Sequence, residues 1–181
     1  YDWYLDGDGD GYGSSSSVQD CGAPSGYVGN ATDCDDGNAS VNPAAPEYCN
    51  SIDDNCDNSI DENTAIDAST FYQDDDGDGY GTNSSLVSCN QPSGYAVNSG
   101  DCNDSNSSIN PGALEYCNSI DDDCDSSTDE GAVDASTYYL DSDGDGYGSI
   151  SSTQSCSQPS GYVSNSSDCN DGNASINPAA S

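Results

Sequence analysis

DGDGDGYG, residues 6–13, places three aspartates two residues apart with glycines between them. These carboxylates repel one another, and the chain has 34 acidic residues but no Lys, Arg or His to neutralise them. Calcium takes about six to eight oxygen ligands, and a loop with carboxylates at positions 1, 3 and 5, Gly at position 6 and a carbonyl at position 7 supplies half of that shell. Magnesium keeps its waters, and softer metals select His or Cys. The stretch therefore predicts a calcium loop formed by Asp6, Asp8, Asp10 and the carbonyl of Tyr12.

The loop occurs three times in the chain. WYLDGDGDGYG at residues 3–13 returns as FYQDDDGDGYG at 71–81 and as YYLDSDGDGYG at 138–148. A fixed step of about 68 residues indicates a repeat protein. We assign the repeats to residues 1–68, 69–135 and 136–181, of which the third is shorter. The second and third loops add the predicted ligands Asp74, Asp76, Asp78, Tyr80, Asp141, Asp143, Asp145 and Tyr147.

The apolar residues are too few for a large core. Leu, Ile, Val and Phe make up 19 of 181 residues, below the roughly 20% at which a highly charged chain is expected to be disordered. Ten cysteines can cross-link a chain that buries little apolar surface, and bound cations contribute folding free energy directly. We therefore expect a folded extracellular chain of small β-structure and irregular loops, stabilised by calcium and disulfides.

Short strands are expected where aromatic and β-branched residues gather between turns. STFYQ (69–73) and STYYL (136–140) fit this description. Two more strands are expected at SLVSC (85–89) and at the segments SGYVGN, SGYAVN and SGYVSN, joined by the Pro-Ser-Gly turn at 24–26, 92–94 and 159–161. NPAAPEYC (42–49) and NPGALEYC (110–117) indicate at most one turn of helix, with Pro at an early position. The thirteen tyrosines are expected to supply most of the core, with a sugar-binding platform as the alternative.

The cysteines follow the same step as the loops. An even number of cysteines without CxxC pairs or His favours disulfides over a zinc site. The third repeat contains only two cysteines, which are expected to bond each other so that no thiol is left free. Applied to all repeats, this predicts the bonds Cys21–Cys34, Cys49–Cys56, Cys89–Cys102, Cys117–Cys124 and Cys156–Cys169.

The loop lacks the acidic residue that closes an EF-hand at position 12, where it has Ser17, Ser85 or Ser152. The missing ligand is expected from DCDD (33–36), which the predicted Cys21–Cys34 bond would bring to the first loop. Asp33 or Asp36 would complete the first site, and the remaining side chains would form a second one. The candidates in the three repeats are Asp33, Asp35, Asp36, Asn38, Asp101, Asn103, Asp104, Asp168, Asn170 and Asp171.

A third acidic cluster follows in the first two repeats. EYCNSIDDNCDNSIDE (47–62) and EYCNSIDDDCDSSTDE (115–130) combine acids with two cysteines each. Two to three calcium ions per full repeat are therefore expected. The candidate ligands are Glu47, Asn50, Asp53, Asp57, Asp61, Glu62, Glu115, Asn118, Asp121, Asp125, Asp129 and Glu130.

The combined pattern of cysteines and acids from residue 33 to residue 62 resembles the MopE-type metal-binding repeat of bacterial secreted and surface proteins. The DGDGYG loop also resembles calcium loops of thrombospondin type 3 repeats and dockerins. The first resemblance implies an extracellular metal-binding module that is often present in several copies, and it implies no catalysis. MopE itself is associated with copper, but this chain has no Met and no His, so copper is not expected.

A structural role is the first functional hypothesis: a calcium-stiffened surface stalk, adhesin segment or filament subunit that associates head-to-tail through partial terminal repeats. The alternative is a calcium-dependent module that binds glycans or a protein. An enzyme is not expected, because no His or Lys base accompanies the carboxylates or serines. The charge disfavours nucleic acid, and no apolar run approaches a membrane span.

The Asn-x-Ser/Thr triplets are candidate glycosylation sites, although a chain this rich in serine contains such triplets by chance and Asn38 is also a candidate metal ligand. Three of these triplets, at Asn38, Asn106 and Asn173, hold the same place in each repeat, and the others begin at Asn30, Asn83, Asn103 and Asn165.

Overall fold

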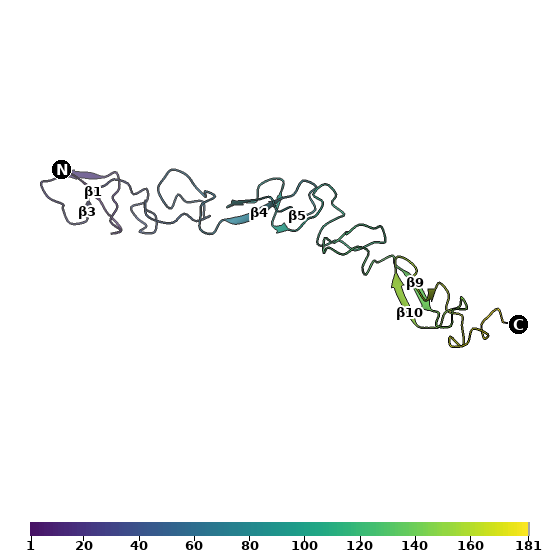
Figure 1. The fold of residues 1–181 in the computed structure, drawn as a ribbon. Coiled ribbons are helices and arrows are strands. Elements are labelled where there is room, and N and C mark those ends of the chain that lie inside the picture. The colour runs from purple at the N-terminus through teal and green to yellow at the C-terminus, as the bar shows by residue number, and fades with distance from the viewer. Residues whose placement is uncertain (181) are drawn as a thin grey trace. The chain divides into compact units, whose positions relative to one another are not determined.

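The computed structural model describes residues 1–180, which form short strands and hydrogen-bonded turns and contain no helix (Figure 1). The chain divides into two compact units, residues 1–73 with 84–98 and residues 74–83 with 99–181. Because there is no helix among these residues, none of their segments is a helix that could cross a membrane. The predicted class, small β-structure in disulfide-linked repeats, is confirmed.

Each repeat begins with a three-stranded antiparallel sheet whose longest strand is central. In the first repeat, Trp3 of the central strand pairs with Val18, and Tyr4 pairs with Val28 on the other side. The third repeat keeps the same register. The sheets are β1 (Asp2–Leu5), β2 (Ser17–Gln19) and β3 (Tyr27–Val28); β4 (Ser69–Gln73), β6 (Ser85–Ser88) and β7 (Tyr95–Ala96); and β9 (Ser136–Leu140), β10 (Ser152–Ser155) and β11 (Tyr162–Val163). A two-residue pair, β5 (Tyr80–Gly81) with β8 (Asn98–Ser99), accompanies the second sheet.

The Asn-Pro segments form turns in place of the single helical turn suggested by their sequence. Val41 donates its backbone N–H to the carbonyl of Asn38 at 2.8 Å, and Ala45 donates to the carbonyl of Asn42 at 2.9 Å. The side chain of Asn42 accepts from the N–H of Ala44 and donates to the carbonyl of Ala39. Asparagine side chains compete with helix in this way, because they satisfy nearby backbone groups locally.

The core is small and contains more acids than apolar side chains. Buried apolar residues are Val41, Ala65, Phe71, Ala96, Ile109 and Ala132, so half of them are no larger than alanine. Seven acidic side chains are equally buried: Glu47, Asp54, Asp74, Asp101, Glu115, Asp122 and Asp168. A buried carboxylate needs hydrogen bonds or a cation to offset the loss of its hydration. The acidic residues are therefore part of the interior, and the fold depends on what satisfies them.

The five predicted disulfide pairings are wrong. Four bonds form, and they follow two rules: the second and fourth cysteines of a repeat bond each other, and the third bonds the first cysteine of the next repeat. The bonds are Cys34–Cys56, Cys49–Cys89, Cys102–Cys124 and Cys117–Cys156, whereas Cys21 and Cys169 are unbonded among the described residues. The prediction failed because it required every cysteine to find a partner within its own repeat.

Candidate metal centres

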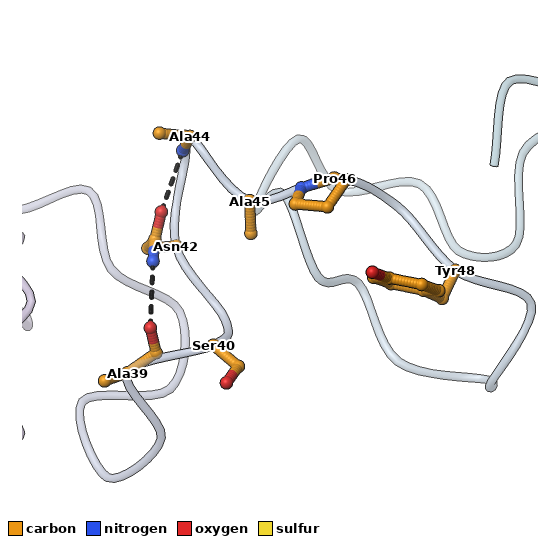
Figure 2. A pocket seen from close by; sticks show the side chains of 7 residues that line it. All are labelled: Ala39, Ser40, Asn42, Ala44, Ala45, Pro46 and Tyr48. Atoms are coloured by element: carbon orange, nitrogen blue, oxygen red, sulfur yellow. Dashed lines mark hydrogen bonds between the residues drawn. The ribbon is translucent and has the colours of Figure 1, made fainter. Parts of the chain in front are cut away.

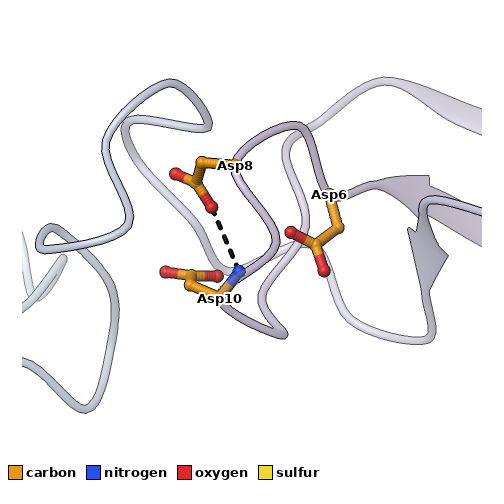
Figure 3. Close-up of side chains that lie close together, drawn as sticks. All are labelled: Asp6, Asp8 and Asp10. Carbon is orange, nitrogen blue, oxygen red and sulfur yellow. Dashed lines mark hydrogen bonds between the residues drawn. The ribbon is translucent and has the colours of Figure 1, made fainter.

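The first acidic loop, residues 6–12, is shaped by hydrogen bonds from its backbone to its own aspartates (Figure 3). Asp6 uses both carboxylate oxygens, which accept the N–H of Gly9 at 2.8 Å and of Gly11 at 3.2 Å. Gly9 and Gly11 adopt φ values of 86° and 96°, a conformation that glycine reaches without steric cost. These two glycines let the chain curl so that its N–H groups face Asp6. We call this loop, with its counterparts at 74–80 and 141–147, loop A.

Asp8 and Asp10 each use one oxygen to hold the turn. Asp8 Oδ1 accepts the N–H of Asp10 at 3.2 Å, and Asp10 Oδ1 accepts the N–H of Tyr12 at 2.8 Å. The Oδ2 atoms of both residues are buried and have no hydrogen-bond partner. One half of each carboxylate thus shapes the loop, while the other half is left without a donor.

Asp33 reaches loop A through backbone contacts and not through the Cys21–Cys34 bond that the sequence suggested. Its N–H donates to the carbonyl of Gly13 at 3.0 Å. The side chain of Asn30 holds the same place, because it accepts the N–H of Gly13 at 3.1 Å and donates to the carbonyl of Gly11 at 3.2 Å. Gly13 allows this close approach, since a Cβ there would lie 2.6 Å from the carbonyl oxygen of Asn30.

The two carboxylate oxygens of Asp33 are arranged like those of Asp8 and Asp10. Its Oδ1 accepts the N–H of Asp35 at 2.8 Å, and its Oδ2 is buried without a partner. Asp101 and Asp168 take the same place in the other repeats, where both side chains are 8% exposed. The unpartnered Oδ2 atoms of loop A therefore form three equivalent sets, on Asp8, Asp10 and Asp33; on Asp76, Asp78 and Asp101; and on Asp143, Asp145 and Asp168.

Burial and mutual repulsion raise carboxyl pKa values in these sets. In the metal-free chain, desolvation is the largest cause of the raised pKa of Asp33, and the charges of Asp10 and Asp8 add to it. The same two causes raise the pKa of Asp76, Asp101 and Asp143. A cation bound among the Oδ2 atoms would remove both causes, because it supplies opposite charge and coordination together.

A second acid of the DCDD segment also faces loop A. Asp36 Oδ1 accepts the N–H of Gly7 at 2.7 Å, and its counterpart Asp104 accepts the N–H of Asp75 at 2.8 Å. In the third repeat, Asp171 accepts both the N–H and the hydroxyl of Ser142. The sequence predicted that either Asp33 or Asp36 would reach loop A. In the structure both do, and only Asp33 has a buried oxygen without a hydrogen-bond partner.

Asp35, Asn38 and their counterparts lie on the surface, and the second centre that they were expected to form remains a prediction. Asp35 is exposed, and Asn38 is exposed with its side-chain oxygen on the N–H of Ser40 at 3.3 Å. Asn103 and Asn170 are likewise exposed. The three equivalent glycosylation candidates, Asn38, Asn106 and Asn173, therefore lie on the surface, where their modification remains a prediction.

A second loop type repeats the geometry of loop A around a cysteine. In residues 53–59, the side-chain oxygens of Asp53 accept the N–H groups of Asp57 at 3.1 Å and Asn58 at 2.9 Å. Asp57 accepts the N–H of Ser59 at 2.8 Å. Cys56 and Asn58 adopt φ values of 56° and 71° at the two positions where loop A has its left-handed glycines. We call residues 53–62 and 121–130 loop B.

Loop B brings together acids that the sequence reasoning only partly identified. Glu115, Asp121 and Asp123 offer oxygens within 4.8 Å of one another, as do Asp123, Asp125 and Glu130. Asp123, with its counterpart Asn55, was not predicted, although its spacing from Asp121 and Asp125 matches loop A. The missing glycines hid this match. In the first repeat, Glu62 carries a buried Oε2 atom without a partner.

The charges of loop B act on one another. The pKa of Glu62 is raised: its own backbone N–H favours the charged form, but desolvation and the charges of Asp57 and Glu47 outweigh that contact. The pKa of Asp123 is raised by desolvation first and by Asp125 and Glu115 next. Glu62 and Asp123 thus resemble the acids of loop A, whereas backbone hydrogen bonds from Ser59 and Ser127 lower the pKa of Asp57 and Asp125.

Three of the predicted ligands of the third cluster are engaged with backbone or amide donors. Glu47 accepts the N–H groups of Asp54, Asn55 and Asp61, and Asp61 accepts the N–H of Ser51 at 2.8 Å. Asn50 donates to Asp54 at 2.9 Å and accepts the N–H of Ile52. The second repeat contains equivalent contacts at Glu115, Asn118 and Asp129. These side chains position loop B, and their role as ligands remains a prediction.

Two aspartates that sequence reasoning missed support the same region. Asp54 is buried and accepts the N–H of Tyr48 at 3.1 Å, and Asp67 accepts the N–H of Cys49 at 2.8 Å. Asp122 and Asp134 do the same in the second repeat. Nothing in their local sequence separates them from surface acids, because their partners lie 6 to 18 residues away.

The described surface also has an open hollow of about 410 Å³ beside the Asn-Pro turn, lined by Ala39, Ser40, Asn42, Ala44, Ala45, Pro46 and Tyr48 (Figure 2). Tyr48 offers a partly exposed ring. The amide of Asn42 is already satisfied on both sides by backbone groups of the turn. The hollow thus presents an aromatic face with few free polar groups.

Three segments of the chain match the family described as "Putative metal-binding motif", of the Cu-binding MopE type, at residues 33–62, 101–130 and 168–181. No curated protein and no solved structure matches the chain. Each matched segment contains the acid at position 33 or its counterpart, and the first two also contain loop B, whereas residues 6–12, 74–80 and 141–147 of loop A lie outside them. Together with the acidic clusters, these three matched segments make the chain a metal-binding repeat protein.

Proposed function

We propose that the chain is an extracellular calcium-binding structural protein in which Ca²⁺ and disulfides replace most of a hydrophobic core. The observation that carries this proposal is the triple set of buried, unpartnered Oδ2 atoms at loop A, each on an aspartate whose other oxygen shapes the backbone. A buried carboxylate oxygen without a donor is costly unless a cation coordinates it. Five centres, three at loop A and two at loop B, are proposed.

Calcium fits these centres better than the alternatives. All candidate ligands are oxygens, and Ca²⁺ accepts many carboxylate and carbonyl oxygens in a flexible shell. Copper would favour imidazole or thioether groups, and the chain has neither His nor Met. Eight of the ten cysteines are in disulfides and cannot act as thiolates. The copper association of the matched family is therefore not carried over.

The disulfides between repeats support a structural role over a catalytic one. The bonds Cys49–Cys89 and Cys117–Cys156 join each repeat to the next, with separations of 40 and 39 residues. Disulfides persist in oxidising compartments, and extracellular calcium is abundant enough to fill modest sites. A covalent link at each junction suits a stalk, an adhesin segment or a filament subunit that associates head-to-tail.

Metal counting tests the proposal directly. Native mass spectrometry of the disulfide-intact chain in Ca²⁺, Mg²⁺, Cu²⁺ or Zn²⁺ should show about five tightly held ions with Ca²⁺ alone. Electron microscopy in millimolar calcium tests self-association, and antibody labelling of intact producing cells tests surface exposure. Preferential retention of Cu²⁺, or retention of no ion, would contradict the proposed chemistry.

A glycan-binding module is the second candidate, because Tyr48 faces an open hollow (Figure 2). A tyrosine ring can stack on the apolar face of a sugar. The occupied amide of Asn42 leaves few polar partners for sugar hydroxyls, which makes this function the weaker proposal. A glycan array with calcium, and with Tyr48→Ala as the control, would decide it.

A further inference from the structure

We propose that the disulfide between the second and fourth cysteines of a repeat couples calcium binding at loop A to calcium binding at loop B. This inference rests on the proposed calcium sites and adds their regulation. In the first repeat the bond is Cys34–Cys56. Occupation of either centre would increase the affinity of the other, and the disulfide would be required for this increase.

At one end, the disulfide lies next to the proposed calcium ligands of loop A. Cys34 directly follows Asp33, whose free buried Oδ2 faces the charges of Asp8 and Asp10. Two residues further along, Asp36 holds the N–H of Gly7 at 2.7 Å. A movement of Cys34 would therefore displace both Asp33, with its free oxygen, and Asp36, which holds the backbone of loop A.

At the other end, the disulfide belongs to loop B. Cys56 occupies the left-handed position between the predicted ligands Asp53 and Asp57. The backbone N–H of Cys34 lies 3.1 Å from Cys56 Sγ, and Cys34 Sγ lies 3.5 Å from the carbonyl oxygen of Asp53. The bond thus joins the residue next to Asp33 directly to a residue inside loop B.

The second repeat has the same arrangement, and the third provides an internal exception. Cys102 bonds Cys124, and the N–H of Cys102 lies 3.2 Å from Cys124 Sγ. In the third repeat, loop A is complete with Asp168, but the adjacent Cys169 forms no disulfide among the described residues. The chain therefore contains two loop-A centres with the connection and one without it.

Two opposite effects contribute to the coupling. A cation at one loop lowers the negative potential that attracts a cation to the other, and salt screens this effect over about 8–10 Å. In contrast, a cation that orders loop B fixes Cys56, and the disulfide then fixes Asp33 before loop A is filled, so that less ordering remains. The second effect requires the covalent bond and the first does not, which makes them separable by experiment.

Trp3 allows calcium binding at the first loop A to be measured separately from the other centres. It is the one tryptophan of the chain, and it lies in β1 three residues before Asp6. Tb³⁺ luminescence excited through Trp3, with Ca²⁺ as the competitor, reports the calcium affinity of this centre. The variant Asp53→Asn/Asp57→Asn disables loop B of the same repeat. Asp121→Asn/Asp125→Asn is the matched control, with equal charge change in the second repeat.

The first variant should weaken calcium binding at the Trp3-monitored centre about five-fold or more, and the control should change it less than about two-fold. In the Cys34→Ser/Cys56→Ser background, the loop-B substitutions should weaken calcium binding less than about two-fold, since only the screened charge effect remains there. Equal weakening with and without the disulfide, or no weakening in the intact chain, would overturn the coupling. A chain that gives no calcium-competed signal at all would instead contradict the proposed calcium function.

The third repeat keeps the inference testable if the serine double variant does not fold. In a chain with Trp3→Tyr and Tyr138→Trp, the reporter monitors the loop A that lacks the disulfide. Neither pair of loop-B substitutions should weaken calcium binding there by more than about two-fold. A five-fold weakening there would show that the coupling does not need this bond, and would overturn it.

Discussion

Removal of calcium with the disulfides left intact should unfold the chain. A ligand that binds only the folded state stabilises it by about 2.7 kcal/mol when its concentration is 100 times its dissociation constant. The unit of residues 1–73 with 84–98 holds two proposed centres, so calcium contributes about 5 kcal/mol to its stability under that condition. The other unit holds three, which gives about 8 kcal/mol.

The apolar core cannot replace this contribution. The buried apolar side chains larger than alanine are Val41 and Phe71 in the first unit and Ile109 in the second. Each contributes roughly 1.5–3 kcal/mol on burial. Ordering the backbone costs about 1–2 kcal/mol for each residue, and domains are stable by only about 5–15 kcal/mol in total. Loss of the calcium term therefore removes a free energy comparable to the whole stability of each unit.

Near-ultraviolet circular dichroism of the tyrosines and hydrogen exchange are the assays. After dialysis against chelator, the tyrosine signal should collapse and amide protection should be lost, with the larger loss in the unit that contains residues 99–181. Added Ca²⁺ should restore both signals, while equal Mg²⁺ should not. An unchanged melting temperature in protein shown by elemental analysis to be free of metal would refute the reasoning.

Three further predictions concern Gly13, Asn58 and the pH dependence of stability. Gly13→Ala should destabilise the first repeat by about 1–3 kcal/mol, because its Cβ would lie 2.6 Å from the Asn30 carbonyl; Gly22→Ala, which meets nothing within 4 Å, is the control in thermal melts. Asn58→Ala should cost about 1–2 kcal/mol relative to Asn58→Gly, since φ is 71° there; equal melting temperatures would contradict this. The folded fraction of the metal-free chain, which is low at pH 7, should rise as pH falls toward about 4, because a raised carboxyl pKa, as at Asp33, contributes stability that is lost as pH rises through it. Carboxyls with lowered pKa values lose their contribution only below about 3.9, outside this range. With calcium bound the trend should reverse, since protons compete for the ligands; parallel trends in chelator and calcium would contradict the assignment.

The parts of the fold that depend on neighbouring residues could be predicted from the sequence. The acids of loop A alternate with glycines over eight residues, so their geometry follows from local turn chemistry. The strands at 69–73 and 136–140 were predicted at the bounds that the structure shows. The position of Asp33 beside loop A was also predicted, although its cause was not. That cause is a hydrogen bond from Asp33 to Gly13, and no local pattern encodes it.

The disulfide pairing could not be predicted because it depends on where loop B lies. Cys56 sits inside a loop whose left-handed positions are filled by Cys and Asn and not by Gly. The absence of glycine concealed the similarity to loop A and with it the place of Asp123 and its counterpart Asn55 in loop B. Once loop B is treated as a second copy of loop A, Cys56 lies at its tip, away from Cys49 and next to Cys34. Disulfide mapping by mass spectrometry should therefore find Cys34–Cys56 and no Cys49–Cys56 bond.

Loop B both offers a metal centre and covers the small apolar core. Val41 and Ile109 hold the same place in the first two repeats and are 2% and 5% exposed. In each, the residue that follows donates its N–H to loop B: Asn42 to Asp54 at 2.9 Å and Asn110 to Asp122 at 3.0 Å. Ile176 is their counterpart in the third repeat, where no loop B follows within the described residues, and it is 42% exposed. The burial of the apolar residue thus depends on the acidic loop. Because the neighbouring carboxylates of that loop repel one another, the proposed calcium binding at loop B would favour the burial of Val41 and Ile109.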